Sequence, residues 1–241
     1  MNLCTTWLAT VGVSEWFAEF ARTFEKCFIR EDRYKLLLEG IGVTIKISLL
    51  AAALGLIIGF LIAICSLSKS KLLRFFGKVY TDVIRGTPSV TQLMIIYFVV
   101  FATVNLDKWI IAAIAFSINS GAYVSEIIRA GILSIDKGQT EAGRSLGLTG
   151  AQTMFYIVVP QAVKNIFPAM CNEFITLIKE TAIVGYVGLM DIQKAGDFIK
   201  SATYLAMMPL IATAIIYFVL IKILTTVLGK IEKRLRKSDI R

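Results

Sequence analysis

The sequence predicts an all-α membrane protein with five transmembrane helices. The first observation is composition, because 56% of the 241 residues are hydrophobic, whereas a soluble domain contains about 45–50%. The second is a series of long uncharged segments, since about 20 apolar residues cross a bilayer as one helix. The third is that these segments lack the alternating pattern of barrel strands, so helices are the remaining way to satisfy the backbone in lipid.

Charge and cysteine usage exclude several function classes. The net charge is +9, but the basic residues gather at the ends of apolar segments, which favours a membrane surface over nucleic acid. The chain has no histidine and no closely spaced cysteine pair, so His-based catalysis and a zinc site are excluded. We expect no catalytic residue, metal or cofactor here. The sequence does not decide whether Cys4 and Cys27 form a disulfide.

Residues 1–39 are predicted to be an extracytoplasmic N-terminal segment. Met1–Val13 lacks the basic start of a signal peptide. Apolar residues then recur at helical spacing, and two interpretations remain open: an amphipathic helix on the outer membrane interface, or an extra packing helix. The residues concerned are Trp16, Phe17, Phe20, Phe24, Cys27 and Phe28.

Residues 40–229 are predicted to form the transmembrane domain. The fourth crossing contains Glu173, Lys179 and Glu180, but it counts as a span because apolar residues surround these charges. The five spans are expected at about 43–66, 86–106, 109–133, 170–190 and 204–228.

The distribution of Lys and Arg predicts the orientation. The connection after the first span and the tail at residues 230–241 are both basic, so both are expected in the cytoplasm. With five spans, the N-terminus is then outside and the C-terminus inside. The basic residues of the connection are Lys69, Lys71, Arg74, Lys78 and Arg85, against Asp82 alone.

The segment 134–167 is predicted to be a cytoplasmic helix–turn–helix loop. Gly147 is a natural helix terminator, and Thr149 with Gln152 has the spacing of a capping box. Pro160 is expected to end the second helix or to bend its exit. The apolar residues Leu146 and Leu148 lie near the bend, which suits insertion into a cleft of a partner protein.

This loop resembles the EAA loop of permeases from binding-protein-dependent ABC importers. The family pattern is Glu-Ala-Ala, three residues, Gly, nine residues, Ile, two residues and Pro. The chain matches it at Glu141, Ala142, Gly147, Ile157 and Pro160, with Gly143 for the second Ala and Val159 for the Leu before the proline.

Three further segments are similar to the polar amino-acid branch of this family. They are residues 85–92, 122–131 and 172–181, and with the loop they extend the resemblance over about residues 40–229. One motif would be weak evidence for the family, but four motifs in the same order and at family-like distances are specific evidence.

The resemblance implies a type I importer in the cytoplasmic (inner) membrane of a bacterium. Its partners would be ATPase subunits that bind ATP and Mg²⁺, a second permease subunit in a homo- or heterodimer, and an extracellular or periplasmic amino-acid-binding protein. The substrate would be a polar amino acid, and no nucleic acid is expected among the partners. The loop residues implied to contact the ATPase are Glu141, Ala142, Gly143, Leu146, Gly147 and Leu148.

The chain itself is not expected to bind ATP. Gly138, Gly143, Arg144 and Ser145 nearly spell a phosphate-binding loop. That motif requires a lysine at the arginine position and a preceding strand, and here a predicted membrane helix precedes it.

An acidic face on the fourth span is the predicted substrate site. Glu173 and Glu180 are two helical turns apart, with Thr176 between them. Ionisable groups at membrane depth cost about 2.5–3.5 kcal/mol each, so they usually face a cavity or a partner. These carboxylates would hold the cationic part of an amino acid; the alternative is a salt bridge to another helix.

Other polar residues of the spans leave two interpretations open. Thr87 and Gln92 follow the break expected at Pro88 and would face the pathway, unless Pro88 simply begins an ordinary helix. Ser117, Asn119 and Ser120 either line the pathway or bond across helices. Glu126 and Arg129, three residues apart, are expected to pair locally.

Two other functions compete with an ATP-driven importer. An ion-gradient-driven secondary transporter usually has a detectable repeat of spans, and none is visible in this sequence. A non-transport membrane scaffold would leave the membrane-depth carboxylates without a role.

Overall fold

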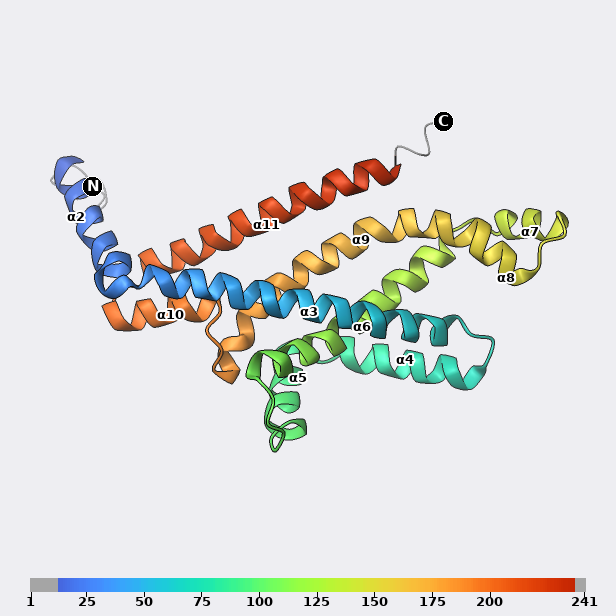
Figure 1. Ribbon diagram of the computed structural model, residues 1–241, viewed down its shortest axis with the longest axis horizontal. Helices are drawn as coiled ribbons and strands as arrows, with labels where there is room; N and C mark the ends of the chain where they lie inside the picture. Colours follow the sequence, from blue (N-terminus) through green and yellow to red (C-terminus); the bar gives the residue numbers. More distant parts are fainter. Residues whose placement is uncertain (1–12, 237–241) are drawn as a thin grey trace, which may run out of the picture.

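The computed structural model describes residues 13–236, and all regular structure in this range is helical (Figure 1). Four helical segments are long and apolar enough to cross a membrane: Tyr34–Leu67, Lys108–Leu133, Gly150–Val187 and Met207–Arg234. A fifth crossing exists only if the bent pair Lys71–Arg85 and Ser89–Val100 counts as one span.

The N-terminal segment contains the helix expected from its aromatic spacing. Helix α2 covers Val13–Phe24 and continues through a π-helical turn at Glu25–Ile29 and a 3₁₀ turn at Arg30–Asp32. It stands at a steep angle to the long helix that follows (Figure 1). Its four aromatic residues are exposed, whereas Cys27 and Phe28 in the turn are buried. Cys4 lies outside the described residues.

Helix α3 covers Tyr34–Leu67, so it begins nine residues before the expected span 43–66. Its 34 residues make it about 51 Å long at 1.5 Å per residue. It packs along most of its length against α6, which covers Lys108–Leu133. A Cβ atom at Gly55 or Gly59 would press on Ser120 or Val124 of α6. This pair of small residues therefore allows close packing within the subunit.

The second crossing differs from the prediction of a single helix over 86–106. The chain forms α4 (Lys71–Arg85), α5 (Ser89–Ile95) and a π-helical turn (Ile96–Val100), with a bend of 103° between the two parts. Pro88 precedes α5 and disfavours a helical conformation at Thr87, which explains the break. Helix α4 was expected to be a basic connection because its charges interrupt the apolar pattern.

The loop between α6 and α9 contains two short helices, α7 (Lys137–Ser145) and α8 (Gly150–Thr153). Gly147 adopts the left-handed conformation with φ of 85°, and the capping box of Thr149 and Gln152 is present. Pro160 does not end the second helix. A π-helical turn at Met154–Val158 leads directly into α9 (Val159–Glu180), whose first turn accommodates the proline.

The C-terminal end of the fourth span is followed by a helix that was not predicted. Helix α9 ends in a 3₁₀ segment, Thr181–Val187, and α10 follows at Ile192–Thr203. Helix α10 packs on α3 and on the start of α11, which covers Met207–Arg236. The spans expected at 170–190 and 204–228 thus correspond to parts of α9 and α11, whereas the polar connection between them is helical.

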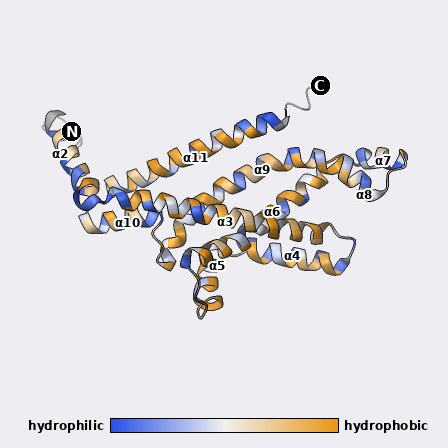
Figure 2. Cartoon of the chain, in the orientation of Figure 1, coloured by the Kyte–Doolittle hydropathy of each residue, from blue (hydrophilic) through white to orange (hydrophobic). Residues whose placement is uncertain are grey.

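The protein core lies around α6, while α11 stands apart from it. Two-thirds of the most apolar window of α6 is buried, compared with 6% of the corresponding window of α11. Helix α11 diverges from the bundle along its length (Figure 1). Figure 2 shows that it is hydrophobic over most of its course and hydrophilic at its last turns. Apolar surface of this extent suits lipid or a second protein subunit.

Candidate functional site

Glu173 and Glu180 are both half-buried on α9, but their surroundings differ. The Glu173 carboxylate accepts a hydrogen bond of 2.8 Å from the Ser120 hydroxyl of α6. Glu180 is the last residue of the helix and has no hydrogen-bond partner among the described residues. Within residues 15–234, no basic side chain lies within 4.0 Å of either carboxylate. The alternative of a salt bridge to another helix is therefore not found in this part of the chain.

Thr176 lies between these carboxylates on the same face of α9, at positions i, i+3 and i+7. Its side chain is exposed, and so is that of Lys179 next to Glu180. We name Glu173, Thr176 and Glu180 the acidic face. It presents two carboxylates and one hydroxyl from a single rigid helix, which is a suitable surface for a cationic group.

Thr87 and Gln92 belong to a different set of contacts, at the bend between α4 and α5. The Gln92 amide nitrogen donates to the Thr87 hydroxyl at 2.6 Å and to the Ile84 carbonyl at 2.7 Å. The Gln92 amide oxygen accepts from the Asn119 side chain of α6 at 2.8 Å. Gln92 is buried, and its polar atoms are already engaged. The structure therefore places these two residues where they hold the bend against α6.

Adjacent residues of α6 connect the bend to the acidic face. Asn119 donates to Gln92 of α5, and Ser120 donates to Glu173 of α9. Of the two interpretations for these residues, bonding across helices is the one observed. Ser117 instead donates to the Ile114 carbonyl of its own helix at 2.7 Å. The Ser120–Glu173 contact was not foreseen from the sequence, because it joins residues far apart in the chain.

The expected local pair between Glu126 and Arg129 is confirmed. Arg129 donates to both carboxylate oxygens, at 3.0 and 2.8 Å. Arg85 adds a second cation that was not expected, because its guanidinium lies 3.9 Å from Glu126 and 5.2 Å from the centre of the Tyr123 ring. Arg85, Tyr123 and Glu126 border a cavity of about 550 Å³ between α6 and α9.

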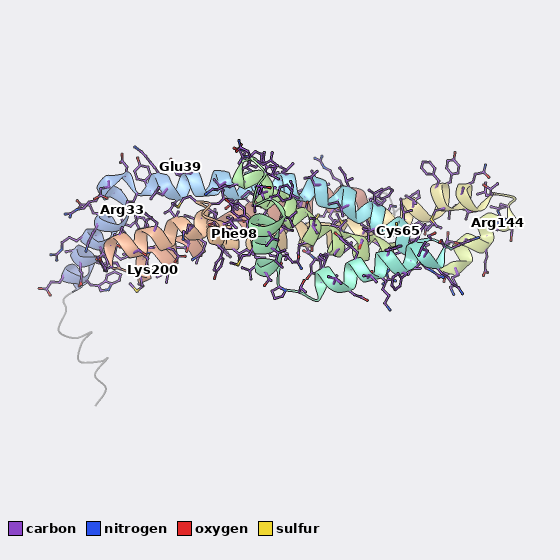
Figure 3. All side chains as sticks on the ribbon, turned by 90° about the horizontal axis from the view of Figure 1, so that it is seen from below. Arg33, Glu39, Cys65, Phe98, Arg144 and Lys200 are labelled. Atoms are coloured by element: carbon purple, nitrogen blue, oxygen red, sulfur yellow. The ribbon has the colours of Figure 1, made fainter. Side chains whose placement is uncertain are left out.

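The loop of α7 and α8 forms an ordered tip at one end of the molecule (Figures 1 and 3). Gly143 is buried against Thr153 and Ile157, so α7 packs directly on the helix that follows. Arg144 donates to the Leu148 carbonyl at 2.7 Å and closes the turn. Glu141 and Ala142 are exposed on α7.

Leu146 is the most exposed apolar side chain of this tip, at 81% of its full accessible area. A leucine exposed at the turn is accessible to another molecule, although a single exposed leucine is common on protein surfaces. Leu148, two residues later, is half-buried. The structure thus brings all six loop residues named above into one small, accessible element.

Asp191 is a buried carboxylate that sequence reasoning missed. It caps α10 by accepting from the backbone amides of Gln193 and Lys194 at 3.1 and 3.0 Å, and it accepts from the Tyr217 hydroxyl at 3.2 Å. Burial raises the pKa of Asp191 above its ordinary value, against the opposing effect of these donors. An Asp directly before residues 192–203 is an N-cap signal, and it could have revealed both helix α10 and the capping role of Asp191.

No group of three His, Cys, Asp or Glu side chains in the described part of the chain is arranged to hold a metal ion. The acidic face contains only two carboxylates.

Comparison with known proteins identifies the family. Residues 55–237 match the family described as binding-protein-dependent transport system inner membrane component. The arginine transport system permease protein ArtQ of Bacillus subtilis is 44% identical over 205 residues, covering 84% of this chain and 94% of that protein. The glutamine transport system permease protein GlnP of Escherichia coli is 35% identical over 204 residues, with coverages of 83% and 93%.

A solved structure agrees with these relatives in sequence and in fold. It is the crystal structure of an amino acid ABC transporter with histidines, which is 41% identical to this chain and superimposes with a TM-score of 0.79. The match covers 86% of this chain and 98% of the other. The chain therefore belongs to the family of inner membrane components of binding-protein-dependent transport systems.

Proposed function

We propose that this chain is the permease subunit of an ATP-driven importer and forms the translocation pathway for a polar amino acid. The observation that carries the proposal is the acidic face of α9. No basic side chain within residues 15–234 lies within 4.0 Å of its two half-buried carboxylates, and ionisable groups at membrane depth are costly. A cationic substrate that passes through the membrane would compensate them.

The substrate class follows from the chemistry of this face. Every amino acid has an α-ammonium group, and Glu180 offers it a carboxylate with free acceptor positions. A second carboxylate at Glu173 favours substrates with a cationic side chain, such as arginine or lysine. The names of the relatives, which include arginine and glutamine transport, agree with a polar amino acid. We assign Thr87 and Gln92 to supporting this region through Asn119.

ATP hydrolysis is proposed to reach the pathway through the tip of α7 and α8. The tip is held together by its own hydrogen bonds and exposes Leu146, so a groove of the ATPase could bind it as a single unit. Helix α9 continues from α8 to the acidic face without a break in the helical path. Motion of the tip would therefore be transmitted along α9. ATP and Mg²⁺ would be bound by the ATPase.

The remaining partners and the topology complete the proposal. The sparsely covered α11 suits a second permease subunit, identical or related, and an extracellular or periplasmic binding protein would deliver the amino acid. The chain would span the bacterial inner membrane five times, with residues 1–39 outside, the loop 134–167 inside and the basic tail 230–241 inside. The bent pair of α4 and α5 would then be one of the five crossings.

Purification and uptake experiments test this proposal against its two rivals. A tagged chain expressed from its own operon should co-purify with an ATPase, and amino-acid uptake in cells should stop when ATP is depleted while the ion gradient is maintained. A secondary transporter would behave in the opposite way. Absence of an ATPase together with uptake that survives ATP depletion would exclude the importer, and absence of any uptake defect on deletion would favour a scaffold.

A further inference from the structure

A charged cleft distinct from the acidic face lies between the end of α3, the helix α4 and the C-terminal part of α6. Its volume is about 360 Å³. Four cations and two carboxylates line it, so its net charge is +2. The charged residues are Arg74, Lys78, Arg85 and Arg129, with Asp82 and Glu126.

The cations of this cleft fall into two pairs. Arg129 is bound to both oxygens of Glu126, and Arg85 lies 3.9 Å from the same carboxylate. Arg74 and Lys78, in contrast, have no side-chain hydrogen bond or ion pair with any residue between 15 and 234. Asp82, one turn beyond Lys78, does not come within 4.0 Å of a basic group. The cleft therefore contains two cations without a partner.

The position of these two cations corresponds to the inner membrane surface. Arg74 and Lys78 lie one turn apart in the first half of α4. The nearby end of α3, marked by Cys65, lies toward the same end of the molecule as Arg144 of the α7–α8 tip (Figure 3). If that tip faces the cytoplasm, as the proposed function requires, the cleft opens at the depth of the inner headgroups. Opposite it, α4 exposes Leu72, Phe75, Phe76 and Val79, which suit acyl chains.

We propose that this cleft binds the phosphate of an anionic lipid headgroup from the inner leaflet. The Arg74 guanidinium and the Lys78 ammonium would donate to the phosphate oxygens, and its charge would offset part of the +2 of the cleft. Basic pockets between membrane helices on the cytoplasmic side are suited to such headgroups. The exposed apolar residues on the opposite face of α4 favour a lipid over free phosphate, because they place this helix beside acyl chains.

Lipid binding to the purified full-length chain tests this inference. Phosphatidylglycerol is titrated into the protein in detergent, and the bound molecules are counted by native mass spectrometry. Phosphatidylcholine and inorganic phosphate are titrated in parallel. The wild-type chain should retain phosphatidylglycerol selectively. The R74Q/K78Q variant should bind it about 30-fold more weakly, because two cations near an anionic headgroup are lost. R74K/K78R, which keeps both charges, should bind normally.

A matched control separates the cleft from general surface charge. The K69Q/K71Q variant also removes two lysines at the start of α4, but neither lines the cleft, so its affinity should remain within about twofold. If R74Q/K78Q does not fold, each single variant should bind about fivefold more weakly. Equal loss in K69Q/K71Q, equal binding of phosphatidylcholine, or binding of inorganic phosphate alone would overturn the inference. The inference would also be overturned if the R74Q/K78Q variant lost a dimer of the chain while its lipid binding stayed unchanged. None of these results depends on transport activity.

Discussion

At the residue scale, the two carboxylates of the acidic face are held in different ways. The Ser120 hydroxyl donates to one oxygen of Glu173, whereas the Glu180 carboxylate has no hydrogen-bond partner in the described chain. Glu180 thus keeps all its acceptor positions for a substrate, while Glu173 has fewer. This difference predicts unequal effects when each is neutralised.

Replacing Glu180 with Gln should raise the KM for transport about 10- to 100-fold, because a charge-assisted hydrogen bond contributes about 1.5–3 kcal/mol. E173Q should raise the KM less, since the Ser120 hydroxyl already occupies one acceptor position of the Glu173 carboxylate. Both are measured as substrate-stimulated ATP hydrolysis by the reconstituted transporter. E39Q, at an exposed position of α3, serves as the control and should leave the KM unchanged. An unchanged KM in E173Q and E180Q would rule out the acidic face as the substrate site.

Asp191 predicts a pH-dependent contribution to stability. Burial raises its pKa in the folded chain, so the folded state holds this proton more tightly than the unfolded state does. The stability from Asp191 is therefore complete below its unfolded pKa of about 3.9 and is lost as pH rises through the raised folded value. D191N keeps the cap without a titration, so its Tm relative to wild type should increase between pH 4 and pH 8.

The control for Asp191 removes the cap itself. D191A should be about 1 kcal/mol less stable than D191N at both pH values, because neither variant titrates at this position and D191A also loses a side chain that accepts two backbone amides of α10. Both variants are compared by thermal unfolding in the same detergent. A D191N protein whose Tm follows the wild-type pH profile without divergence would show that this carboxylate does not titrate differently on folding.

At the element scale, the bend between α4 and α5 depends on one amide side chain. Q92A should lower the free energy of unfolding by about 1–3 kcal/mol, because the Asn119 amide and the Ile84 carbonyl lose their buried partner. The double variant Q92A/N119A should lose less than the sum of the single variants, since the two residues share a bond. Additive losses in this cycle, or a large KM effect without a loss of Tm, would instead favour direct substrate contact by Gln92.

The turn between α7 and α8 makes a second prediction about an element. Gly147 has a φ of 85°, and a Cβ atom there would meet nothing within 4 Å. The cost of G147A is therefore only the left-handed backbone, about 1–2 kcal/mol. We expect substrate-stimulated ATP hydrolysis to fall severalfold while binding of the substrate stays unchanged.

G150A provides the matched control for the turn, because its Cβ would also meet open space but its backbone is not left-handed. It should retain full stimulation. If G147A and G150A behave alike, the geometry of the turn does not govern coupling to the ATPase.

At the scale of the whole molecule, the sequence is most informative where structure depends on local pattern. Short stretches of sequence predict the span that corresponds to α6 and the capping box of Thr149. Both features are present in the structure. Helix α4 was missed because its basic residues interrupt the uncharged pattern, although they occupy one side of an amphipathic helix. The Ser120–Glu173 bond joins residues 53 positions apart. It follows from how α6 packs on α9, which no local pattern specifies.

The orientation of the molecule across the membrane is the last property that the sequence predicts and that labelling can test. Ser145 at the end of α7 and Ser201 in α10 are both exposed. They neighbour Arg144 and Lys200, which lie at opposite ends of the molecule (Figure 3). S145C and S201C, each in a chain whose natural cysteines are replaced by serine, form a matched pair. A membrane-impermeant maleimide should label S201C in intact cells, whereas S145C should react only in inside-out vesicles. The expectation follows from the excess of Lys and Arg predicted on the cytoplasmic side. Labelling of S145C in intact cells would place the tip outside, where no ATPase could reach it, and the ATP-driven mechanism would be excluded.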